Sequence, residues 1–216
     1  MRTTGKRTGH GLRQRHFSMI RDFHVADFFT LANGACGTAA IFLAMEHIRD
    51  PRPGRVYAAL VLVVAAFVFD VLDGRIARRR HTSSALGREL DSLADVISFG
   101  VAPAALAFAV GMSKELDAIV LLYFVTCGIS RLARFNVTAA ELSDASGKVA
   151  YFEGTPIPTS TVLVVVMAGL AWLRRTGADL PFGVIGIFGA DLHPLVLMFA
   201  LSGSLMISKT LRIPKP

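Results

Sequence analysis

The chain has 216 residues, of which 53% are hydrophobic and 18% charged, and its formal net charge is +7. A soluble domain carries charge at about a quarter of its positions, so this composition argues against one. Apolar runs near twenty residues long match the length that a helix needs to cross a hydrocarbon core about 30 Å thick. The positive charge requires no nucleic-acid partner, because basic residues beside membrane spans contact membrane lipids. We therefore expect an all-α polytopic membrane protein.

Six transmembrane helices account for the apolar runs. We place them at residues 28–47, 55–79, 87–112, 115–136, 156–174 and 191–210. The apolar stretch 180–190 is rich in glycine, which favours a loop or re-entrant segment over a seventh span. This division leaves a basic leader at 1–27 with a short interfacial helix, a six-helix domain at 28–210 and a tail at 211–216.

The positive-inside rule orients these spans. An N-terminus in the cytoplasm puts most of the 23 lysines and arginines on the cytoplasmic side. We expect both termini to be cytoplasmic and the protein to lie in the cell (inner) membrane. The two cysteines, Cys36 and Cys127, fall in apolar spans and are predicted to be packing residues, not a disulfide.

The second and third predicted spans each contain a pair of aspartates, Asp70 with Asp73 and Asp91 with Asp95. Ionisable residues within spans are costly and are functional candidates by default. Residues three or four positions apart share one face of a helix. Each of these two helices is therefore predicted to present an acidic stripe.

The depth of the two stripes is predicted to match. Residues 56–69, all apolar or aromatic, precede Asp70 and give about 21 Å of helix, and residues 96–112 after Asp95 give about 25 Å. All four carboxylates then lie near the cytoplasmic face.

Carboxylates crowded at low dielectric repel one another, and either protonation or a cation must relieve that repulsion. Oxygen ligands favour Mg²⁺ or Mn²⁺. Two other interpretations remain: the aspartates anchor helix ends by pairing with Arg75, Arg78 and Arg88, or they belong to a divalent-cation transporter. Transport sites usually lie nearer the midplane, on broken helices.

From Asp70 to Asp95 the sequence reads DVLDGRIARRRHTSSALGRELDSLAD. It resembles the CDP-alcohol phosphotransferase family, whose signature D-x2-D-G-x2-A-R-x8-G-x3-D-x3-D it matches at every fixed position. The resemblance implies six transmembrane helices, a homodimer and a two-metal site that faces the cytoplasm and holds Mg²⁺ or Mn²⁺. It also implies transfer of a phosphatidyl-type group from a CDP-activated lipid to an alcohol.

The resemblance further implies a role for each matching position. The metal ligands would be Asp70, Asp73, Asp91 and Asp95, with Asp95 also the general base. The CDP-lipid would contact Asp73, Gly74, Ala77, Arg78, Gly87 and, in the first span, Asn33. At the glycines, a missing Cβ lets the nucleotide approach the backbone. The planar guanidinium of Arg78 would pair with the pyrophosphate.

Other segments narrow the choice of acceptor alcohol. They read SFGVAP from Ser98, GISRLARFN from Gly128 and YFEGTPIP from Tyr151, with TLAN at residues 30–33. Together they resemble the phosphatidylserine synthase branch of the family. This implies CDP-diacylglycerol as donor and L-serine as acceptor, with phosphatidylserine and CMP as products.

The residues at the end of the fourth span fit an amino-acid acceptor. Arg131 and Arg134 lie three positions apart, beside Ser130 and Asn136, and a guanidinium is the expected counter-charge for a carboxylate. We expect these four residues to bind the acceptor. Two alternatives remain: the arginines anchor the span at the interface, or they bind a phosphorylated polyol such as glycerol phosphate or inositol phosphate.

Overall fold

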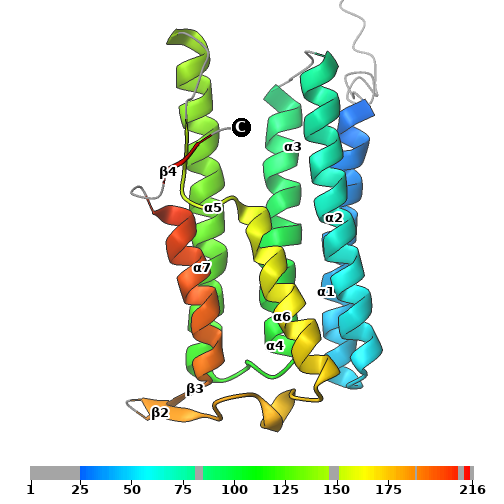
Figure 1. The fold of residues 1–216 in the computed structure, drawn as a ribbon, viewed down its shortest axis with the longest axis vertical. Coiled ribbons are helices and arrows are strands. Elements are labelled where there is room, and N and C mark those ends of the chain that lie inside the picture. Colours follow the sequence, from blue (N-terminus) through cyan, green and yellow to red (C-terminus); the bar gives the residue numbers. More distant parts are fainter. Residues whose placement is uncertain (1–24, 81–84, 146–150, 188, 209–211, 215–216) are drawn as a thin grey trace, which may run out of the picture.

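The computed structural model describes residues 25–80, 85–145, 151–187, 189–208 and 212–214. The fold is a bundle of long helices that run roughly side by side (Figure 1). Most of the basic leader, with its predicted interfacial helix, lies outside the described residues.

Within the described residues, four stretches of helix are long and apolar enough to cross a membrane, at 26–49, 53–76, 86–109 and 115–138. They coincide with the first four predicted spans and indicate a multi-pass membrane protein. The elements that form them are α1 (Val25–Arg49), α2 (Pro53–Arg80), α3 (Ala85–Asp95) with η2 (Val96–Val101) and α4 (Ala102–Ala109), and α5 (Glu115–Ala145).

The fifth and sixth predicted spans correspond to shorter apolar helices, Ile157–Trp172 and Pro194–Ile207. At about 1.5 Å per residue they are about 24 and 21 Å long, less than a hydrocarbon core of about 30 Å. Six transmembrane helices therefore stay a prediction, while four follow from length and composition. The short elements are η3 (Ile157–Ser160), α6 (Thr161–Trp172), η5 (Pro194–Val196) and α7 (Leu197–Ile207).

The glycine-rich stretch 180–190 contains a strand instead of a seventh span. After η4 (Gly177–Asp179), β2 (Ile185–Ile187) pairs antiparallel with β3 (Ala190–Leu192) to form a hairpin at the lower end of the bundle (Figure 1). Near the other end, β1 (Tyr151–Glu153) pairs antiparallel with β4 (Arg212–Pro214). Both cysteines are free, as predicted.

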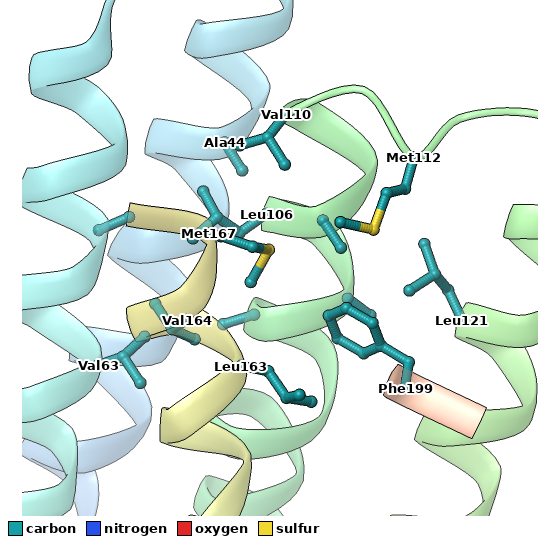
Figure 2. Packing of buried hydrophobic residues seen from close by; sticks show 14 of the residues in the cluster. Ala44, Val63, Leu106, Val110, Met112, Leu121, Leu163, Val164, Met167 and Phe199 are labelled. Carbon is teal, nitrogen blue, oxygen red and sulfur yellow. The ribbon is translucent and has the colours of Figure 1, made fainter. Parts of the chain in front are cut away.

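The core joins all the long helices. Figure 2 shows Val63 of α2 beside Val164 of α6, and Leu106 of α4 beside Met167 of α6. Phe199 of α7 packs edge-on against Phe124 of α5, with ring centroids 5.2 Å apart. Large apolar side chains also remain exposed along the bundle, among them Phe42, Val61, Leu122, Val162 and Leu201. Apolar exposure on this scale suits a surface that faces lipid.

One close helix contact positions the acidic residues. At Gly37 of α1, a Cβ would come within 2.6 Å of the Ser98 Cα, so the missing side chain lets α1 and η2 touch. The η2 segment is a π-helical turn that begins directly after Asp95. Such turns often occur at functional sites, and this one sets the direction in which the chain leaves the acidic stripe of α3.

Candidate active site

Three of the four predicted ligand carboxylates meet between α2 and α3. Asp70, Asp91 and Asp95 each contribute one oxygen to a group in which all three atoms lie within 4.8 Å of one another. Asp91 and Asp95 are one helical turn apart on α3, and Asp70 faces them from α2. The same-face spacing read from the sequence thus leads to a shared cluster in space.

The fourth aspartate, Asp73, lies beside this group but is held by another helix. Its Oδ2 accepts a 2.8 Å hydrogen bond from the hydroxyl of Thr30 on α1. Asp73 is buried and interacts electrostatically with Asp70 and Asp91. The structure therefore brings all four aspartates into one neighbourhood, with three of them gathered most closely.

The first helix also holds Asp95. The side-chain amide of Asn33 donates a 3.1 Å hydrogen bond to Asp95 Oδ1, and the Ser98 hydroxyl donates one of 2.9 Å to the Asn33 backbone carbonyl. Asn33 and Ser98 are completely buried and Asp95 nearly so. This double connection between α1 and the α3–η2 junction fixes the orientation of the Asp95 carboxylate.

The predicted acceptor residues on α5 take different positions. Arg131 interacts electrostatically with Asp95, and its Nε is buried without a hydrogen-bond partner among the described residues. Asn136 donates a 2.9 Å hydrogen bond to the Ser92 hydroxyl, so it links α5 to α3. Arg134 is partly exposed and Ser130 is exposed. Only Arg131 thus directly approaches the acidic cluster.

The predicted contacts to the CDP-lipid are spread over three helices. Gly74 on α2 and Gly87 on α3 are partly buried. Ala77 and Arg78 continue α2 on the same side as Asp70 and Gly74 by helical spacing, but their side chains lie outside the described part of the structure. Asn33 on α1 donates a hydrogen bond to Asp95, and its contact with the CDP-lipid stays a prediction.

On α1, Asn33 belongs to a buried polar stripe that the sequence-based prediction did not include. Asp27, Thr30 and Asn33 recur at every third position and are all buried, and Asp27 interacts electrostatically with Asp73. Three polar residues at helical spacing in an otherwise apolar run form a signal of the same kind as the aspartate pairs. The stripe makes α1 the third wall of the site.

The acidic cluster fits a divalent cation. All of its ligand atoms are carboxylate oxygens, which Mg²⁺ and Mn²⁺ prefer. Asp91 Oδ1 is buried and has no hydrogen-bond partner among the described residues. A buried carboxylate oxygen without a donor is unfavourable, and a cation held by Asp70, Asp91 and Asp95 would remove that cost.

Comparison with known proteins places this arrangement in a family. The family model described as CDP-alcohol phosphatidyltransferase matches residues 23–203. The chain is 46% identical over 212 residues to the CDP-diacylglycerol–serine O-phosphatidyltransferase of Saccharomyces cerevisiae, a match that covers 94% of this chain and 75% of the yeast protein.

Prokaryotic relatives match a shorter part. The CDP-diacylglycerol–serine O-phosphatidyltransferase of Helicobacter pylori is 44% identical over 130 residues, or 59% of this chain and 53% of its own length. The archaetidylserine synthase of Methanothermobacter thermautotrophicus is 37% identical over 141 residues, or 64% of this chain and 54% of its own length. This chain thus covers about half the length of these two relatives, against three quarters of the yeast protein.

Proposed function

Because the chain belongs to the CDP-alcohol phosphatidyltransferase family, we propose that it transfers the phosphatidyl group of CDP-diacylglycerol to the hydroxyl of L-serine. The products are phosphatidylserine and CMP. The observation that carries this proposal is the cluster of three carboxylates, in which one oxygen from each of Asp70, Asp91 and Asp95 lies within 4.8 Å of the others. Arg131 interacts electrostatically with Asp95 in this cluster.

The choice of serine rests on the relatives and on Arg131. Both the yeast and the Helicobacter relatives are named as serine O-phosphatidyltransferases, and the archaeal relative is named as an archaetidylserine synthase. A phosphorylated polyol would also attract an arginine, but none of these names supports it. The family likewise favours a transferase over a divalent-cation transporter.

We assign the cation to the three clustered carboxylates. Asp70, Asp91 and Asp95 would hold Mg²⁺ or Mn²⁺, and a second ion, which the two-metal prediction requires, would involve Asp73. When bound, divalent metal neutralises the pyrophosphate and stabilises the CMP leaving group.

The protein residues perform the remaining steps. Asp95, oriented by Asn33, accepts the proton of the serine hydroxyl as that oxygen attacks the phosphorus of the phosphatidyl group. A new P–O bond forms to serine, the P–O bond to CMP breaks, and the electron pair leaves with CMP. Positioned proton transfer of this kind contributes typically 10²–10⁴-fold. Arg78 would bind the pyrophosphate and Arg131 the serine carboxylate.

We also propose where the site lies in the membrane. Six spans with both termini in the cytoplasm put the acidic cluster near the cytoplasmic face of the cell membrane, where soluble serine and the lipid donor meet. Two copies of the chain would form a homodimer. Bringing donor and acceptor together in one site lowers the entropic part of the barrier.

The test uses the detergent-purified full chain with CDP-diacylglycerol and a panel of labelled acceptors: L-serine, glycerol 3-phosphate, inositol phosphate and choline. We expect phosphatidylserine and CMP in equal amounts, dependent on Mg²⁺ or Mn²⁺ and abolished by a chelator. A detergent solution has no sealed compartment, so CMP release also separates an enzyme from a transporter. Preferential use of a phosphorylated polyol would overturn the assignment of serine.

A further inference from the structure

Two polar atoms next to Asp95 are buried without a partner among the described residues. One is the side-chain oxygen of Asn33, an acceptor, and the other is Nε of Arg131, a donor. Buried polar atoms are almost always hydrogen-bonded in folded proteins. An unmatched acceptor on the residue that bonds Asp95 and an unmatched donor on the arginine that interacts with Asp95 therefore point to a ligand that brings one group of each kind.

The orientation of the Asn33 amide follows from its partner. A carboxylate only accepts hydrogen bonds, so the NH₂ group of Asn33 must face Asp95 and its carbonyl oxygen must point elsewhere. The backbone of Asn33 is held by Ser98, and the side chain is completely buried. The free oxygen is thus a fixed acceptor that lies one amide group away from the carboxylate of Asp95.

Arg131 provides the opposite chemistry. Its guanidinium has only donors, and it interacts electrostatically with Asp95. An anionic group of the ligand is the natural partner for the unused Nε. The site then offers an acceptor from α1, a proton-accepting carboxylate from α3 and a cationic donor from α5.

We propose that Asn33 determines the specificity for an amino-alcohol acceptor by receiving its ammonium group at the side-chain oxygen. The carboxylate of the same ligand lies at Arg131 and its hydroxyl at Asp95. This inference rests on the proposed transfer to serine and deepens it. It also replaces the contact with the CDP-lipid that the sequence alone predicts for Asn33.

A substrate lacking only the ammonium tests this assignment. 3-Hydroxypropionate keeps the hydroxyl and the carboxylate of serine, so its kcat/KM reports everything except the ammonium contact. We expect the parent enzyme to prefer L-serine over 3-hydroxypropionate by roughly ten- to a hundredfold, the value of one charge-assisted hydrogen bond. In Asn33→Leu this preference should largely vanish, because both acceptors lose the amide that orients Asp95 but only serine loses the ammonium contact.

Two further variants guard against a purely structural effect. Asn33→Ala removes both the amide donor and the carbonyl acceptor, and it should lose the preference in the same way. Thr30→Val removes the hydrogen bond to Asp73 one turn away on α1 and should lower kcat/KM for both acceptors alike, with the preference retained.

The outcomes separate the two proposals. A parent enzyme that uses serine and 3-hydroxypropionate equally, or an Asn33→Leu enzyme that keeps the full preference, overturns the role of Asn33 but leaves transfer to serine intact. A parent enzyme that ignores serine and uses glycerol 3-phosphate overturns the proposed function itself, and the role of Asn33 with it.

Discussion

The two ends of the helix bundle differ in whether their buried polar atoms have hydrogen-bond partners. Around Asp95, the oxygens Asp91 Oδ1 and Asn33 Oδ1 and the donor Arg131 Nε have no partner among the described residues. At the other end, where α5 begins, Asp117 is completely buried. Its oxygens there accept hydrogen bonds from the backbone N–H groups of Lys114 and His193 and from His193 Nδ1, at 3.0, 2.8 and 2.7 Å.

This contrast distinguishes carboxylates that can bind a ligand from a carboxylate that stabilises the fold. A buried carboxylate whose oxygens are occupied by the protein has nothing left to offer a ligand, and at Asp117 it attaches the segment after the β2–β3 hairpin to α5. Carboxylates gathered without enough donors repel one another, and such a cluster is stable only with a cation or protons from outside. The same residue type is therefore predicted to be structural at one end and catalytic at the other.

The largest effect is expected from the clustered ligands. Asp91→Asn or Asp70→Asn should abolish phosphatidylserine formation, because the remaining carboxylates cannot rebuild the group without a helix shift. A titration of activity against Mg²⁺ and Mn²⁺ measures the effect. The matched control is Asp191→Asn, which changes a half-exposed aspartate at the opposite end and should keep normal metal dependence. Near-normal activity of either cluster variant at ordinary metal concentration would contradict the assignment.

Asp95 should show a smaller loss that lies mainly in kcat. Asp95→Asn keeps the size of the side chain but cannot accept the serine proton, so turnover should fall about a hundredfold or more. Binding of CDP-diacylglycerol should weaken less, which an equilibrium binding measurement with the nucleotide lipid will show. A collapse of nucleotide-lipid binding, with the pH profile of the remaining turnover unchanged, would make Asp95 chiefly a ligand.

Replacing Arg131 should weaken binding of the acceptor serine and leave binding of the lipid donor almost unchanged. Arg131→Ala should raise KM for serine roughly ten- to a hundredfold, with little change in KM for CDP-diacylglycerol. Arg134→Ala is the matched comparison, and because Arg131 is the one of the two that interacts with Asp95, we expect Arg134→Ala to have the smaller effect. Serine methyl ester, which lacks the negative charge, should be a poor acceptor for the parent and should discriminate less between parent and variant. Equal use of serine and its ester by the parent would remove the case for carboxylate recognition.

The sequence predicted what depends on local spacing. Aspartates three or four residues apart inside apolar runs indicate one helix face, and Asp70, Asp91 and Asp95 indeed gather in space. The sequence did not predict contacts between segments far apart in the chain. Thr30 donates a hydrogen bond to Asp73, 43 residues further along, and Asp117 contacts His193, 76 residues further along. Composition also overstated the length of the last two helices, because apolar flanks at 156–174 and 191–210 include turns and strand residues. Such pairings depend on how the helices pack, which no single helical pattern contains.

The smallest effect on turnover, and the largest on stability, is expected at the Asp117 end. Asp117→Ala leaves three donors without their acceptor, and each buried polar group left unsatisfied costs about 1–3 kcal/mol. The variant should lose its monodisperse state in detergent at a clearly lower temperature, measured by size-exclusion chromatography after heating.

Asp191→Asn is the control, because Asp191 pairs with Lys114 at 3.7 Å on the exposed surface, where an ion pair contributes little. The fraction of Asp117→Ala that remains folded should form phosphatidylserine at the rate of the parent. A folded Asp117→Ala enzyme with strongly reduced kcat would mean that the two ends of the bundle are coupled, and the division into a structural and a catalytic end would be wrong.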